Sequence, residues 1–241
     1  MWHLPMPRPS DAFQPATPQS SIHGSADMLP LELSPPWLEM PEEQFKQRYG
    51  PRQKTSTAFL GRTLLRSLNE VLANAPSERA LTKKPLTVNL SPPLRLAPLP
   101  RELRFYIFNA TQNSGERKQD AFKIQLSTRP ADAVESGKSA RYKFDRSGNI
   151  LPILVGYYAP LNVYILWDAD LHDLGAGYSY SNSVYSKSEV VYEAAALGVA
   201  ESDFRLRNGI VENIIAARSD ALVEGLKRRI KATVDRSLGG W

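Results

Sequence analysis

The sequence of 241 residues contains no cysteine. This absence excludes disulfide scaffolds, thiolate zinc sites, iron–sulfur clusters and a cysteine nucleophile. Long apolar runs are also missing, and none approaches the roughly 18 residues of a membrane span. The N-terminal residues MWHLPMPRPS lack the charged region and apolar core of a secretory signal. These absences predict a soluble, cytoplasmic protein without a membrane partner.

Histidine is scarce, with three in the chain, and several catalytic signatures are missing. No phosphate-binding loop, dinucleotide fingerprint or Gly-x-Ser-x-Gly elbow occurs, so we expect no cofactor. The D/E-x-K spacing with which restriction enzymes hold Mg²⁺ is not met either, because Asp120-Ala-Phe-Lys123 has one residue too many.

The net charge is +5 at pH 7, with a sequence pI near 9.4. The basic excess lies outside the N-terminal segment, and residues 101–146 carry ten Lys or Arg against six Asp or Glu. This distribution permits a polyanionic partner such as DNA. It equally fits the solvated surface of an ordinary soluble protein.

Proline content divides the chain into regions. Residues 1–40 contain eight prolines, which predicts an extended or disordered arm. From Ser56 to Ala75, leucines recur on one stripe, which predicts a helix that ends before Pro76. We expect a disordered Pro-rich arm over residues 1–50, a helix plus a Pro-rich connector over 51–100, and an α+β domain over 101–241.

The clearest pattern lies between Arg104 and Leu126, where two apolar segments flank a polar loop. It predicts a β-hairpin with strands at Arg104–Ala110 and Ala121–Leu126. Further strands are predicted at residues 86–90, 141–145, 150–157, 163–168 and 210–217, and helices at 189–197 and 220–234. This order predicts an α+β fold with a curved antiparallel sheet or partly open barrel and flanking helices.

Five segments follow one another in the order RFYIFNAT, GERKQDAFKIQL, LVGYYAPLNVYILWDADLH, SKSEVVYEAAALGVA and IIAARSDALVEGL. Together they resemble the methylase-associated X1 domain of bacterial restriction systems and the N-terminal regions of some HNH-type restriction endonucleases. The local matches are Arg117, Asp120, Phe122, Lys123, Ile124 and Gln125; Gly156-Tyr157 with Trp167-Asp168 and His172; and Ala216, Arg218, Asp220 and Leu222. In the first of these the family has an Arg, then Asp-Glu-Tyr-Arg-Ile-Gln.

The resemblance implies DNA recognition in a restriction–modification or related phage-defence system. It ends near Val223, and we expect no nuclease or methyltransferase domain in the residues that follow. The partners that it implies are double-stranded DNA and a methyltransferase or nuclease subunit.

The polar residues of the predicted hairpin suit this reading. Cations contact phosphates, and amides and guanidinium groups read base edges in the major groove. Two other polar tips add candidates, so the predicted DNA-binding residues are Arg117, Lys118, Lys123, Gln125, Arg146, Tyr180 and Lys187. The alternative is that these side chains are the solvent-facing half of ordinary strands.

The strongest catalytic candidate is the segment WDADLHD. On a strand, Asp168, Asp170 and His172 would share one face and hold a divalent cation for phosphodiester hydrolysis. No HNH spacing surrounds His172, however. The alternative is an acidic strand end in which Asp168 or His172 makes a structural hydrogen bond.

We therefore predict a DNA-binding recognition or accessory protein that acts through binding rather than through chemistry of its own. Two alternatives stay open. One is a small metal-dependent DNA endonuclease that uses Asp168, Asp170 and His172. The other is a non-catalytic assembly subunit, in which the predicted helix at residues 56–75 would dock a partner methyltransferase or nuclease.

Overall fold

The computed structural model describes residues 34–50, 55–91, 99–112, 120–126, 141–173, 177–179 and 182–239. Most of the predicted N-terminal arm lies outside these ranges and stays a prediction. Residues Ser34–Trp241 group into one unit by their contacts. None of the described helices is both long and apolar enough to cross a membrane.

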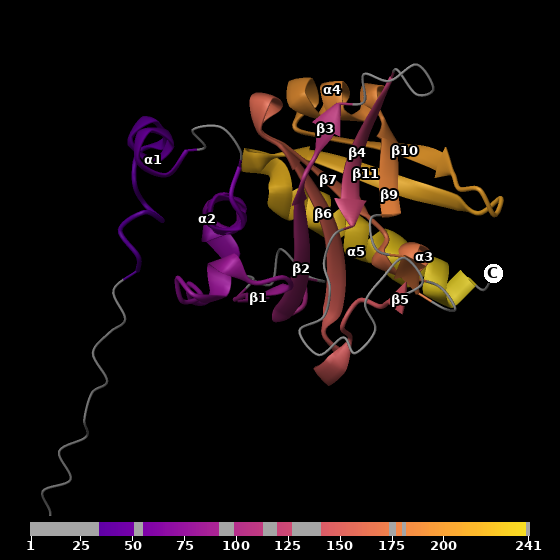
Figure 1. Ribbon diagram of the computed structural model, residues 1–241, viewed down its shortest axis with the longest axis horizontal. Coiled ribbons are helices and arrows are strands. Elements are labelled where there is room, and N and C mark those ends of the chain that lie inside the picture. The colour runs from indigo at the N-terminus through magenta and orange to yellow at the C-terminus, as the bar shows by residue number, and fades with distance from the viewer. Residues whose placement is uncertain are drawn as a thin grey trace, which may run out of the picture. The chain divides into compact units, whose positions relative to one another are not determined.

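A curved, open six-stranded sheet forms the centre of this unit (Figure 1), in the order β1-β2-β6-β7-β11-β10. Neighbouring strands are antiparallel, except that β2 and β6 run parallel. The strands are β1 (Leu86–Asn89), β2 (Glu102–Asn109), β6 (Leu151–Tyr158), β7 (Val163–Trp167), β10 (Val199–Arg205) and β11 (Val211–Arg218). The predicted α+β class with a curved sheet is confirmed.

Helices cover one face of the central sheet. They are α2 (Thr57–Ser67) and α5 (Leu222–Gly239). Helix α1 (Glu42–Tyr49) packs against α2, where the rings of Phe45 and Phe59 stack. Helix α2 begins at Ser56, whose hydroxyl accepts a hydrogen bond from the Phe59 amide at 3.1 Å and so satisfies a free donor of the first turn. Its leucine stripe packs with Leu226 of α5 and Phe105 of β2 in one core.

A second layer covers the opposite face. It consists of the small sheet β3-β4-β9 and helix α4 (Ser188–Leu197), with β3 at Thr111–Gln112, β4 at Ala121–Leu126 and β9 at Asn182–Lys187. Phe122 and Ile124 of β4 share a second core with Trp167 of β7. Beside this layer, β5 (Arg141–Tyr142) pairs with β8 (Tyr178–Ser179).

Gly156 of β6 sets how closely the small sheet approaches the central one. A Cβ atom at this position would lie 2.6 Å from Ile124 and 2.9 Å from the Trp167 ring. Only glycine leaves room for this contact without a shift of the neighbours. The position of β4 therefore depends on the absence of a side chain at Gly156.

The predicted hairpin between residues 104 and 126 is wrong in its pairing. Both strands exist, but β2 pairs with β1 and β6, whereas β4 pairs with β3 and β9. The chain changes sheets after Asn109, so of the residues before the loop only the short β3 pairs with β4. Burial on both faces of β2 explains the difference, because such a strand belongs in the middle of a covered sheet.

The predicted helix at residues 56–75 is too long. It ends at Ser67, and a 3₁₀ turn, Asn69–Val71, follows. Beyond this turn the backbone pairs with the end of β1, where the Ala73 amide donates to the Asn89 carbonyl at 3.0 Å. Tertiary pairing ends the helix earlier than its leucine pattern suggests.

Candidate nucleic-acid interface

The small sheet presents a polar outer face. Along β4 the apolar side chains are buried, whereas Lys123 is half-buried and Gln125 is exposed. Because side chains alternate across a strand, these two point away from the core. The pairing places Thr111 of β3 and Tyr185 of β9 on either side of Lys123, and Ser183 beside Gln125.

A hollow of about 310 Å³ lies at one side of this face. Its lining residues are Lys84, Phe108, Asn109, Thr111, Lys123, Gln125 and Ser183. The Lys84 ammonium lies 4.1 Å from the centre of the Phe108 ring, a cation–π distance. Burial lowers the pKa of Lys84 to about 8, because an amine that is shielded from water is harder to protonate.

A second hollow, of about 540 Å³, lies along the other side of β9. It is lined by Leu171, His172, Asn182, Ser183, Val184, Tyr185, Phe204, Arg205, Leu206, Arg207 and Asn208. Three of these, Arg205, Arg207 and Asn208, are exposed at the tip of the β10–β11 hairpin. The Leu206 amide donates to the Ile210 carbonyl at 2.8 Å and closes this turn.

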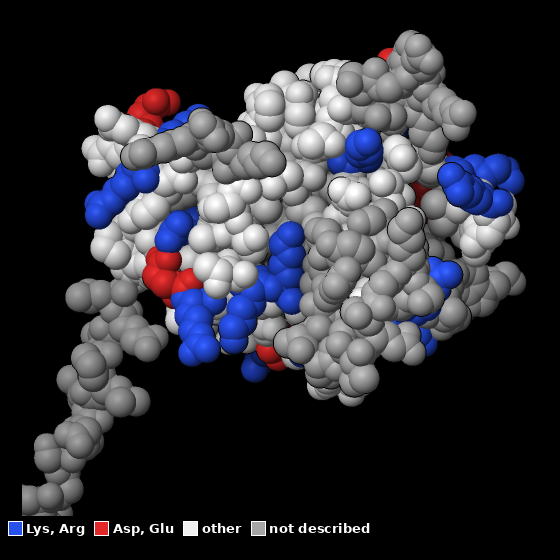
Figure 2. Space-filling view, viewed as in Figure 1, with Lys and Arg blue, Asp and Glu red and all other residues white. Residues whose placement is uncertain are grey.

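Ser183 lines both hollows, so they are neighbours on this side of the molecule, and we call the two together the basic groove. Its described lining includes Lys84, Lys123, Arg205 and Arg207 and no Asp or Glu. On the described surface of this side of the molecule, Figure 2 shows several blue groups, one over the β10–β11 hairpin at the right, and few red ones. The described lining of the groove therefore offers cations and no carboxylate.

The predicted DNA-binding residues separate into three groups. Lys123 and Gln125 line the groove, and Lys187 is exposed at the end of β9. Arg117, Lys118 and Tyr180 lie outside the described residues. Arg146 lies elsewhere, within a cluster of ion pairs.

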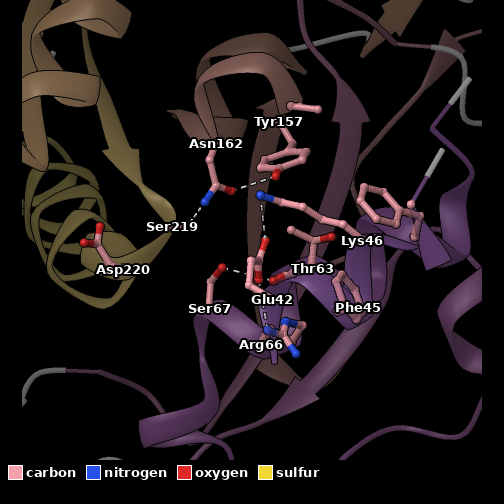
Figure 3. Close-up of a pocket in the computed structure, with 13 residues that line it drawn as sticks. Glu42, Phe45, Lys46, Thr63, Arg66, Ser67, Tyr157, Asn162, Ser219 and Asp220 are labelled. Atoms are coloured by element: carbon pink, nitrogen blue, oxygen red, sulfur yellow. Dashed lines mark hydrogen bonds and ion pairs between the residues drawn. The ribbon is translucent and has the colours of Figure 1, made fainter. Parts of the chain in front are cut away.

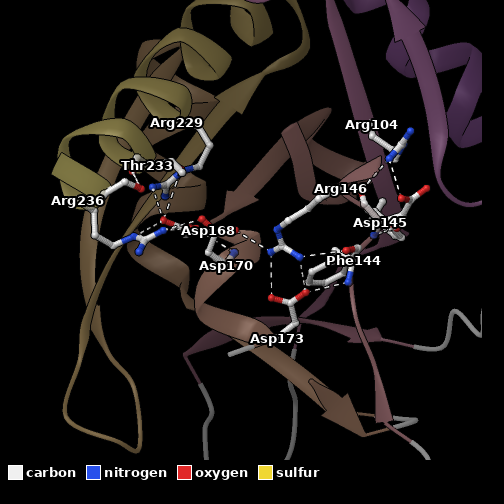
Figure 4. A network of polar contacts seen from close by, with 12 residues as sticks. Arg104, Phe144, Asp145, Arg146, Asp168, Asp170, Asp173, Arg229, Thr233 and Arg236 are labelled. Carbon is white, nitrogen blue, oxygen red and sulfur yellow. Dashed lines mark hydrogen bonds and ion pairs between the residues drawn. The ribbon is translucent and has the colours of Figure 1, made fainter. Parts of the chain in front are cut away.

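That cluster joins α5 to the segment after β7 (Figure 4). Arg146 donates to Asp173 at 2.8 Å and to Asp170 at 2.7 Å, and these hydrogen bonds hold the pKa of Arg146 above its ordinary value. Arg236 of α5 reaches Asp168 at 2.8 Å and Asp170 at 2.9 Å. The guanidinium of Arg146 is thus engaged within the protein.

The premise of the catalytic candidate, a strand through Asp168, Asp170 and His172, is wrong. Asp168 caps the short helix α3 (Ala169–His172) and accepts from the Asp170 amide at 3.0 Å. His172 contacts the buried Glu212 at 3.0 Å. The described residues contain no group of three His, Asp or Glu side chains arranged to hold a metal ion.

A further hollow, of about 440 Å³, lies between α1 and the end of β6 (Figure 3). Its lining mixes both charges, since Glu42 and Asp220 occur beside Lys46 and Arg66. Glu42 accepts from Arg66 at 2.9 Å, and Asp220 pairs with Arg218 at 2.8 Å. This mixture suits a polyanion less well than the basic groove does.

Lys84, Arg205 and Arg207 are groove residues that sequence reasoning missed. A signal existed for the arginines, because Asn208-Gly209 between two alternating segments is a strong hairpin pattern, and Gly209 has φ +85°. Lys84 lies in the predicted connector. Its sequence neighbourhood carries no indication of its contact with Phe108.

The comparisons agree with the resemblance seen in the sequence. The methylase-associated X1 family matches residues 101–226, more than half of the chain and most of both sheets. Searches of curated proteins and of solved structures gave no match. The match includes β4, β9 and the β10–β11 hairpin, and the chain belongs to the methylase-associated X1 family.

Proposed function

We propose that the protein binds double-stranded DNA through the basic groove, as a recognition or accessory component of a bacterial restriction–modification system. The observation that carries the proposal is the groove's lining, which has cations in both hollows, Gln125 in one, Ser183 in both, and no described carboxylate. We expect the protein to act in the cytoplasm, where such systems meet foreign DNA.

The two kinds of groove residue suit the two parts of a DNA duplex. Arg and Lys contact phosphates and supply affinity that does not depend on sequence. Gln side chains form paired hydrogen bonds with adenine in the major groove, which also admits a two-stranded β-ribbon. The β10–β11 hairpin (Figure 1) places Arg205 and Arg207 at an exposed tip, where we propose that they contact the backbone.

We propose a methyltransferase as the protein partner. The family's description as methylase-associated supports this. The endonuclease alternative lacks such support, because Asp168 and Asp170 pair with arginines and His172 pairs with Glu212. Co-purification with a methyltransferase of the same restriction–modification system tests the partner, and retention of the complex at moderate salt is expected.

The direct test is fluorescence anisotropy with matched unmodified and methylated duplexes of about 20 base pairs. We expect salt-sensitive binding to the wild type and at least about tenfold weaker binding to the Arg205→Glu/Arg207→Glu variant, because two phosphate contacts become repulsive. A preference between the two duplexes would identify the modification that is read.

The matched control is Lys231→Glu. This residue makes an i,i+4 pair with Asp235 on α5, which covers the other face of the central sheet (Figure 1). It should bind DNA as the wild type does. Equal affinity of the arginine variant and the control would exclude the hairpin from the interface, and no binding by the wild type to any duplex would refute the proposal.

A further inference from the structure

Lys84 occupies an unusual position for a charged side chain. It is half-buried in the lining of the basic groove, with its ammonium over the Phe108 ring. Among the described residues it has no hydrogen bond to an acceptor and no acidic partner. A desolvated cation is unfavourable without a counter-ion, and the described residues supply none, so the arrangement favours the binding of an anion.

The surrounding residues supply what a phosphate needs. Lys123 of β4 lines the same hollow and brings a second ammonium group. Thr111, Gln125 and Ser183 add hydroxyl and amide donors to the lining, and phosphate oxygens accept hydrogen bonds from all these groups. A volume of about 310 Å³ leaves ample room for one phosphate group.

We propose that the Lys84–Lys123 hollow is a phosphate-binding site. The proposal deepens the proposed function and rests on it only for the source of the phosphate, which we take to be the DNA backbone. The same chemistry would admit a free phosphate compound, and the test separates the two sources.

The groups that face Lys84 link the binding of phosphate to the protonation of this residue. Lys123 is the charged residue in the lining, and β2, β3 and β9 contribute Phe108, Asn109, Thr111 and Ser183, which do not titrate. Burial brings the pKa of Lys84 to about 8. A bound phosphate favours the ammonium form and raises that pKa again. Phosphate binding is therefore accompanied by proton uptake at every pH at which Lys84 is partly neutral.

The linkage has a measurable size. With a pKa of about 8 before binding, Lys84 is mostly charged at pH 7 and mostly neutral at pH 9. If only the ammonium form binds, the affinity should fall about tenfold between these two pH values.

The experiment measures binding of pyrophosphate and, separately, of a duplex of about 20 base pairs, at pH 7 and pH 9 and constant ionic strength. Three variants are compared with the wild type. Lys84→Met removes the charge, Lys84→Arg keeps a charge that does not titrate in this range, and Lys83→Met alters the exposed neighbour as a control.

We expect the wild type and Lys83→Met to bind both probes with the tenfold pH effect. Lys84→Met should bind pyrophosphate at least about tenfold more weakly, and Lys84→Arg should retain binding without the pH effect. Pyrophosphate binding of this pattern, with no binding of duplex, would support the pocket and refute DNA as its source. Pyrophosphate affinity that is unchanged in Lys84→Met, or undetectable in the wild type, would overturn the proposal.

Discussion

Lys84 lies half-buried against Phe108, and its burial should make the native protein less stable at neutral pH. The pKa of this group falls from 10.5 to about 8 on folding. The unfolded chain therefore binds more protons between these values, and the stability of the wild type rises with pH across that window. Below pH 8 the full cost of the buried charge is present.

Replacing Lys84 with methionine should remove this cost. We expect Lys84→Met to raise the free energy of unfolding by roughly 1 to 3 kcal/mol at pH 7, after allowance for partial exposure and the lost cation–π contact. The gain should shrink as the pH rises from 8 towards 10.5. Urea denaturation at pH 7 and pH 10 measures both values, and a loss of stability at pH 7 would contradict the assignment.

Removal of the Asp168 side chain should destabilise the fold, because it breaks a buried ion-pair cluster. The side chain is 1% exposed and contacts Arg229 at 3.4 Å and Arg236 at 2.8 Å. Asp168→Ala leaves the buried Arg229 without this partner, which should lower the free energy of unfolding by about 3 to 5 kcal/mol. Chemical denaturation checks this, and Asp235→Ala, which breaks the exposed pair with Lys231, should cost under about 1 kcal/mol.

This result would also separate a structural role from a catalytic one. A carboxylate that ligates a metal ion generally lowers the stability of the protein, because a set of such ligands holds like charges close together. Asp168 instead lies among arginines. An Asp168→Ala variant as stable as the wild type would show that the ion pairs contribute little.

At the scale of the elements, the contact between β4 and β6 depends on Gly156. A methyl group there would meet Ile124 and the Trp167 ring within 3 Å. We expect Gly156→Ala to lower the free energy of unfolding by about 1 to 3 kcal/mol through overpacking. Gly239→Ala, which meets no atom within 4 Å, is the control in the same thermal denaturation series, and equal melting temperatures would argue against this tight contact.

Most element positions could be predicted from the sequence, because apolar runs and turn residues are local signals. Strand β4 occupies Ala121–Leu126 as predicted, and α4 ends before Gly198 as predicted. Pairing could not be predicted in the same way. The assignment of β2 and β4 to one hairpin used nearness in sequence, whereas the partners of β4 include β9, some 60 residues later.

The candidate site shows the same division. Lys123 and Gln125 were accessible to prediction, because they are the polar half of an alternating strand. Arg146 was not, because its acidic partners Asp170 and Asp173 follow it by 24 and 27 residues and meet it only in the folded chain. A cation that is engaged within the protein looks the same in a sequence as one that binds DNA.

For the whole molecule, the groove sets the dependence of DNA affinity on salt. If Lys84, Lys123, Arg205 and Arg207 each neutralise one phosphate, the slope of log K against log salt concentration should be about −3.6. Affinity should then fall about a hundredfold between roughly 50 and 200 mM salt. Anisotropy titrations across this range measure the slope, and a value near zero would show that these four residues do not act together on phosphates.

The parallel pairing of β2 and β6 has a consequence for how the chain folds. Leu103 pairs with Leu151, so nearly 50 residues, β4 among them, must be looped out before this ladder closes. Such non-local pairs form later than local ones such as β6–β7 and β10–β11. During synthesis, β9 and the β10–β11 hairpin emerge after β6 and β7. The basic groove is therefore completed only once the last strands of the central sheet have been made. A nascent or half-folded chain therefore lacks the complete surface with which we propose it holds DNA.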